Sequence, residues 1–156
     1  MKPFNLLPEK NSMSMKQLLD EYGESHQNKT NKLIHYFAVP IIFWTVTAML
    51  WSVKLPQPAY NLAIVATALT AIYYISKDLI IALQMIVFTI ICLLLNQWLE
   101  NQGLPLLYIA IGLFVMAWIF QFIGHHIEGK KPSFFKDLQF LLVGPAWIVN
   151  SIFSKK

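Results

Sequence analysis

Long apolar runs separated by short polar segments dominate the chain. Four of them, at about 33–53, 60–76, 79–95 and 104–123, are predicted to form membrane-spanning helices, since about 20 apolar residues cross a hydrocarbon core of about 30 Å. A fifth run, 134–153, is interrupted by polar residues and can form a span, a re-entrant segment or an interfacial helix. The pattern predicts an all-α fold: a polytopic membrane helical bundle of four to five spans.

The N-terminal part has a different pattern. Residues 1–12 contain two prolines and mixed charge, which favours an irregular arm. From 14 to about 23, apolar residues recur at helical spacing and predict a short amphipathic helix on the membrane surface; they are Met15, Leu18, Leu19 and Tyr22. We therefore expect a single membrane domain, with the arm and surface helix in 1–32 and transmembrane helices in 33–153.

Composition agrees with a membrane protein. Hydrophobic residues make up 56% of the 156 residues and charged residues 13%, about half the usual charged share of roughly 25%. The net charge of +4 comes from lysines. These lysines flank the apolar runs, which suits anionic lipid head groups better than nucleic acid. Cys92 is the only cysteine and can form no internal disulfide.

The four histidines lie at the ends of apolar runs. His26 lies just before the first run and His35 at its start, and His125 and His126 follow the fourth. Four spans separate the two pairs, and an even number of crossings returns the chain to the same membrane face. Most lysines fall on that face, with Lys54 on the other, so the positive-inside rule makes it cytoplasmic.

Histidines gathered on one face indicate a metal site, because imidazole binds Fe, Zn, Cu and Ni. On one continuous helix His26 and His35 would point in opposite directions. The polar segment 28–32 is therefore predicted to be a turn that brings them together. His125 and Glu128 share one face if the helix continues past Gly124, so Glu128 can be a ligand or can orient a ligand imidazole. His126 points about 100° away from His125 and completes the site only if the helix unwinds.

Both histidine segments resemble a known family. The segment EYGESHQNKTNKLIHYFAVP (21–40) resembles a block of the membrane-bound 2-hydroxy fatty acid dioxygenases in its Tyr, both His, the Asn-Lys pair and the Pro. The segment QFIGHHIEGKKPSFFKDLQFLLVGP (121–145) is similar to that family's Gln-Phe-x-Gly-His block, with the Glu, the Pro and the later Gly-Pro.

The resemblance implies an Fe(II)-dependent dioxygenase of fatty acid α-oxidation. Such an enzyme converts a 2-hydroxy long-chain fatty acid and O2 to CO2 and the fatty acid one carbon shorter. His26, His35 and His125 are the implied iron ligands, His126 a possible fourth, and Glu128 a ligand or supporting residue. The substrate carboxylate would be neutralised by a nearby lysine, for which the candidates are Lys29, Lys32, Lys130 and Lys131.

Two rival interpretations compete with this one. A membrane hydroxylase or desaturase with two irons needs about twice as many histidines. A small transporter or scaffold, with a metal- or proton-binding histidine cluster, is the alternative outside enzymes, although the spans carry almost no charge. The run lengths suit either a bacterial inner membrane or the endoplasmic reticulum.

Overall fold

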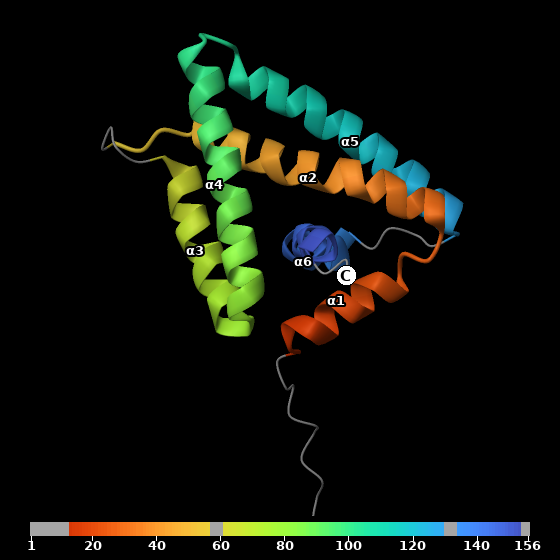
Figure 1. Cartoon of the computed structure of the whole chain (residues 1–156). Helices are drawn as coiled ribbons and strands as arrows, with labels where there is room; N and C mark the ends of the chain where they lie inside the picture. The colour runs from red at the N-terminus through yellow and green to blue at the C-terminus, as the bar shows by residue number, and fades with distance from the viewer. Residues whose placement is uncertain (1–12, 57–60, 130–133, 154–156) are drawn as a thin grey trace, which may run out of the picture.

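The computed structural model describes residues 13–56, 61–129 and 134–153, and within these ranges the chain forms six α-helices (Figure 1). The predicted irregular arm, 1–12, lies outside the described residues. The helices are α1 (Met15–Glu24), α2 (Lys29–Ser52), α3 (Leu62–Lys77), α4 (Leu79–Asn101), α5 (Leu106–Glu128) and α6 (Phe134–Phe153). The expectation of an all-α, membrane-type bundle is confirmed.

Side-chain caps set most of the helix starts. Ser14 and Gln17 form a capping box at α1, and Asn61 caps α3. Asp78 closes the tight corner between α3 and α4, where its side chain accepts a hydrogen bond from the backbone N–H of Ile81. Asn28 caps α2 by accepting from the N–H groups of Thr30 and Asn31. These side chains satisfy backbone donors that a helix leaves without internal partners.

The start of α2 corrects the sequence-based prediction. Residues 28–32 do not form the expected turn, because Asn28 is the cap and Lys29 already begins the helix. The bend lies in 25–28 instead. Pro40 lies well inside the helix, where proline removes one backbone hydrogen bond, yet α2 runs unbroken to Ser52.

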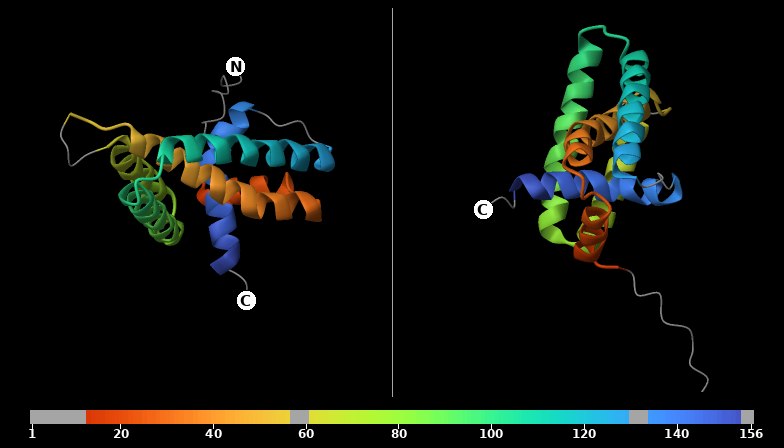
Figure 2. Two further views of the ribbon diagram at one scale, coloured as in Figure 1. Left: turned by 90° about the horizontal axis from the view of Figure 1, so that it is seen from above. Right: turned by 90° about the vertical axis from the view of Figure 1, so that its right-hand side faces the viewer.

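Two antiparallel pairs and a crossing helix make up the architecture. The α2–α5 pair and the α3–α4 pair meet at the end where Lys54 forms a 2.7 Å ion pair with Glu100 (Figure 1). Helix α6 crosses both pairs at a steep angle and also packs across α1 (Figure 2). Buried residues Val143, Ala146 and Val149 place the second half of α6 in the main core.

Three helices of the described chain, α2, α4 and α5, are long and apolar enough to cross a membrane. Helix α3 and the part Leu141–Phe153 of α6 are shorter apolar helices. Large apolar side chains stay exposed on the outside of α3 and α4, as at Leu69 and Ile80, which suits contact with lipid. The apolar face of α1 is covered by α6 instead, because Met15, Leu18, Leu19 and Tyr22 are buried in the same core.

Candidate metal centre

Three histidines come together where α1, α2 and α5 meet. His26 follows α1, His35 lies in the second turn of α2, and His125 lies in the last turn of α5. One ring nitrogen of each belongs to a group in which all atoms lie within 4.8 Å of one another. His26 and His35 are 2% and 1% exposed, and His125 is half-buried. The paired course of α2 and α5 brings the two segments together at one end of the bundle.

His26 and His35 are held in the same way. Nδ1 of His26 lies 2.6 Å from the carbonyl oxygen of Tyr22, and Nδ1 of His35 lies 2.9 Å from that of Asn31. A carbonyl oxygen only accepts hydrogen bonds, so each Nδ1 carries the proton and each Nε2 keeps the lone pair. A histidine fixed by its other nitrogen in this way is the usual form of a metal-binding imidazole.

Tyr22 supports the His26 ring. The two rings are stacked with centroids 4.2 Å apart and planes 18° from parallel. Trp147 of α6 packs on Tyr22 from another side, with centroids 5.4 Å apart. A Cβ at Gly144 would lie 3.1 Å from the Tyr22 hydroxyl, so this glycine lets α6 approach closely. Helix α6 therefore helps to hold a histidine that lies on another segment.

Glu128 fastens the end of α5 to the start of α2. Its carboxylate accepts from the backbone N–H groups of Gln27 (2.9 Å) and Asn28 (3.0 Å) and from the side-chain amide of Asn31 (2.9 Å). A carboxylate at a helix N-terminus is also favoured by the helix dipole. Glu128 does not belong to the group of nitrogens around His26, His35 and His125. In this structure it acts as a clamp between segments that carry histidines.

Asn31 occupies the centre of the clamp. It is fully buried, its carbonyl oxygen accepts from His35, and its side chain donates to Glu128. Its Oδ1 lies directly against Gly124, where an added Cβ would collide with it. Gly124 is therefore required by the close approach of α2 and α5, and the same contact keeps the carbonyl below His35 in place.

The remaining predicted site residues lie further out. Helix α5 continues unbroken to Glu128, so His126 points away from the group and is exposed. Lys29 is exposed and Lys32 is half-buried at the start of α2. The other two candidates for the substrate carboxylate, Lys130 and Lys131, lie outside the described residues.

Sequence reasoning missed Tyr22, Asn31 and Gly124 as site residues. Tyr22 has the spacing of an apolar anchor on α1, and this spacing alone does not indicate that its ring stacks on His26. Asn31 and Gly124 belong to the two segments quoted above. Asn31 precedes His35 by one helical turn, and Gly124 directly precedes His125. The register in which α2 pairs with α5 is the signal that would have connected Asn31 with Gly124.

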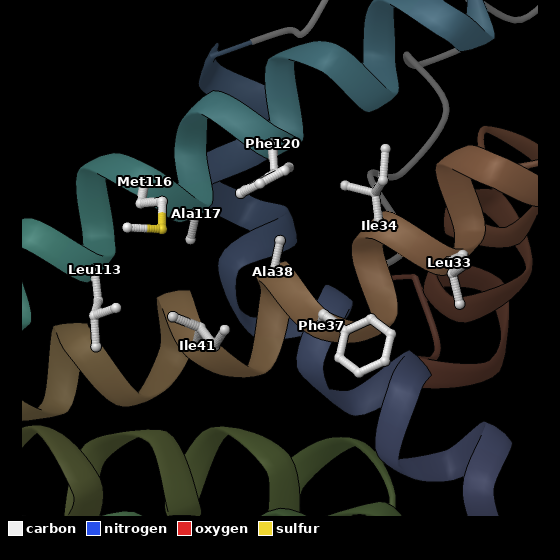
Figure 3. Close-up of a pocket in the computed structure, with 9 residues that line it drawn as sticks. All are labelled: Leu33, Ile34, Phe37, Ala38, Ile41, Leu113, Met116, Ala117 and Phe120. Carbon is white, nitrogen blue, oxygen red and sulfur yellow. The ribbon is translucent and has the colours of Figure 1, made fainter.

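An apolar groove lies on another side of the α2–α5 pair (Figure 3). Phe37, which lines it, follows His35 by two residues and so points about 160° away at about 100° per residue. The contact of Gly124 with Asn31 and Ile34 closes the seam between the two sides. The groove therefore does not lead to the histidines; its lining residues are Leu33, Ile34, Phe37, Ala38, Ile41, Leu113, Met116, Ala117 and Phe120.

The fold and the histidine group together define an α-helical protein of membrane type with a candidate metal centre at one end of its bundle. Residues 12–156 match the family model described as 2-hydroxy-palmitic acid dioxygenase Mpo1-like. The chain is 33% identical over 140 residues to the 2-hydroxy-palmitic acid dioxygenase MPO1 of Saccharomyces cerevisiae, covering 88% of this chain and 78% of the yeast protein. The chain belongs to the Mpo1-like family. No solved structure matches it.

Proposed function

We propose that the protein is an Fe(II)-dependent dioxygenase of 2-hydroxy fatty acids, with iron held by His26, His35 and His125. The observation that carries the proposal is the group of three imidazole nitrogens within 4.8 Å, in a chain whose relative is named a 2-hydroxy-palmitic acid dioxygenase. Metal–imidazole bonds are about 2 Å long, so two nitrogens on one ion lie about 3–4 Å apart. No two of the three nitrogens are further apart than 4.8 Å, which is close to that spacing. His126 is not included in the proposed ligand set.

The proposed reaction balances without a further reductant. A 2-hydroxy acid and O2 give the acid one carbon shorter, CO2 and water. The bond between C1 and C2 breaks, C1 leaves as CO2, and C2 becomes the new carboxyl carbon. C1 gives up one electron and C2 three, and these reduce both oxygen atoms of O2 fully. The substrate is therefore the only electron donor that the reaction needs.

The residues around the centre suit such a substrate. Iron, when bound, would supply the reactivity toward O2 and a chelating partner for the substrate's carboxylate and hydroxyl. Three neutral imidazoles leave the positive charge of the ion uncompensated, which favours an anionic ligand. Tyr22 and Trp147 shield His26 from water. The apolar spans offer the acyl chain a lipid-like surrounding while its head group stays at the end of the bundle.

Lys32 is the described lysine that best suits the substrate carboxylate. It precedes His35 by three residues and so points within about 60° of it, whereas Lys29 points about 120° away. Lys32 is also half-buried, while Lys29 is exposed. Of the two, we propose Lys32 as the partner of the carboxylate.

We further propose that the histidine group faces the cytoplasm. Lys16, Lys29 and Lys32 lie in the two helices that meet at the group, and Lys54 lies at the far end of α2. A lysine excess at one end of the spans favours the cytoplasmic side. Labelling of single cysteines introduced at Lys29 and Lys54 by an impermeant reagent, in oriented vesicles in a Cys92→Ala background, would decide the orientation.

Metal analysis of the purified protein tests the proposed ligands. We expect about one iron per chain after anaerobic reconstitution, and its loss in His35→Ala and His125→Ala. His126→Ala is the matched control, since this exposed neighbour lies in the same helical turn and outside the group. Wild-type protein should consume O2 and release CO2 from 2-hydroxypalmitate. Binding of metal without turnover would instead support the transporter or scaffold.

A further inference from the structure

Gln121 is a buried amide in an otherwise apolar part of α5. Its side chain is 5% exposed, but its amide atoms are not among the fully enclosed polar atoms that lack a partner, so water or a ligand can reach them. Polar groups in such positions usually have a partner in a protein group, water or a ligand. A ligand group that reaches this amide can therefore hydrogen-bond to it.

The register of the α2–α5 pair places Gln121 beside the histidine group. It precedes His125 by four residues, so the two side chains share one face of α5. Across the seam, Gly124 lies against Asn31 and Ile34, while Ala117 packs with Ala38 and Ile42.

Because the helices are antiparallel, this register sets Gln121 level with His35. This register predicts that Gln121 lies near His35, one turn further from the end of the bundle than His125. We infer from this register that the amide faces the inner side of the candidate metal centre.

We propose that Gln121 hydrogen-bonds to the 2-hydroxyl group of the bound fatty acid and so selects 2-hydroxy acids over unsubstituted ones. This inference rests on the proposed function. With the head group at the metal and the acyl chain among the spans, C2 lies on the inner side, where Gln121 is. The amide can accept from a hydroxyl and can donate to it. A buried group of this kind disfavours an analogue without the hydroxyl, because the amide is then left unpaired.

Ligand binding under anaerobic conditions tests the role of Gln121 without turnover. Iron-loaded wild-type protein and the variants Gln121→Leu and Gln121→Met, both apolar and of similar size, would be titrated with 2-hydroxypalmitate and with palmitate in detergent micelles. Thermal stabilisation reports binding, and iron content is measured on the same samples. We expect both variants to lose preference for the 2-hydroxy acid by about tenfold or more, with palmitate binding and iron content unchanged.

The other outcomes overturn the proposal. Equal weakening of both ligands would assign Gln121 to the carboxylate or to the general shape of the site. Retained preference in both variants would show that the hydroxyl is recognised elsewhere, and loss of iron would make Gln121 part of the metal centre. A wild-type protein that does not prefer 2-hydroxypalmitate would refute the proposed function itself, which separates the two failures.

Discussion

Gly124 gives the sharpest test of the contact between α2 and α5. In Gly124→Ala the added Cβ would fall on Oδ1 of Asn31. Either the two helices move apart or the Asn31 side chain moves and gives up its hydrogen bond to Glu128. Both routes disturb the residue whose carbonyl oxygen holds His35. The substitution should therefore affect stability and metal binding together.

The expected magnitude follows from three contributions. Overpacking a close contact costs about 1–3 kcal/mol. Loss of a hydrogen bond to a charged group costs about 1.5–3 kcal/mol, less where water reaches the carboxylate, as it does at half-buried Glu128. Replacing a glycine by alanine within a helix returns up to about 1 kcal/mol. We expect a net destabilisation of about 2–4 kcal/mol.

Gly112→Ala is the matched control. This glycine lies in the same helix, and an added Cβ there meets nothing within 4 Å. Only the helix-propensity gain remains, so the control should be unchanged or more stable by up to about 1 kcal/mol. Both substitutions replace glycine by alanine, but their effects on the free energy of unfolding should have opposite signs.

Denaturant titration in detergent micelles, followed by circular dichroism, compares the two variants with the wild type. Competition with an iron chelator measures metal affinity on the same samples, and for Gly124→Ala we expect a loss of about 10- to 100-fold, as is typical when a residue that positions a ligand is disturbed. Equal stability and equal iron affinity of the two variants would refute the assigned contact.

Substitutions at Glu128, Lys32 and Tyr22 test neighbouring contacts. Glu128→Ala should lower iron affinity about tenfold or more, because it releases the clamp between α5 and α2, and Glu128→Gln should lower it less. Competition with an iron chelator measures both affinities. An unchanged iron affinity in Glu128→Ala would contradict the clamp. Lys32→Gln should raise KM for 2-hydroxypalmitate several-fold with kcat unchanged, because about 1 kcal/mol of attraction to the substrate carboxylate is lost. An equal rise of KM in Lys29→Gln would show that Lys32 is not the specific partner of the carboxylate. Tyr22→Phe should retain iron and activity because the ring stacking remains, while Tyr22→Ala should lose iron. Loss of iron in Tyr22→Phe would instead show that the Tyr22 hydroxyl supports the site.

The apolar pattern predicts the helices well because each long run has one stable solution in lipid. Backbone polar groups must pair within the segment, so an uninterrupted apolar run becomes a helix. The corner at Asp78 is equally readable, since the same side chain ends one run and caps the next. The start of α2 was less readable because Asn28 and Lys29 suit a turn and a capped helix alike.

The site was predictable only as far as chain topology determines it. The four predicted spans, an even number, would bring His35 and His125 to one face, and the structure places these two histidines together. Rotation about each helix axis depends on packing, which one sequence does not display. Hence His126 looked like a possible ligand although it faces outward, and Glu128 looked like a ligand although its oxygens are occupied by Gln27, Asn28 and Asn31.

The position of the histidine group follows from the conflicting needs of its parts. Three imidazoles and a carboxylate require hydrogen-bond partners, and the middle of an apolar span offers none. At the end of the bundle, helix ends supply them: the carbonyls of Tyr22 and Asn31 hold two imidazoles, and the open N–H groups before α2 hold Glu128. Further along α5 the buried residues are mostly apolar, with Gln121 the polar one nearest to His125. A ligand with a polar head and a long apolar chain matches this gradient, and a fully polar ligand does not.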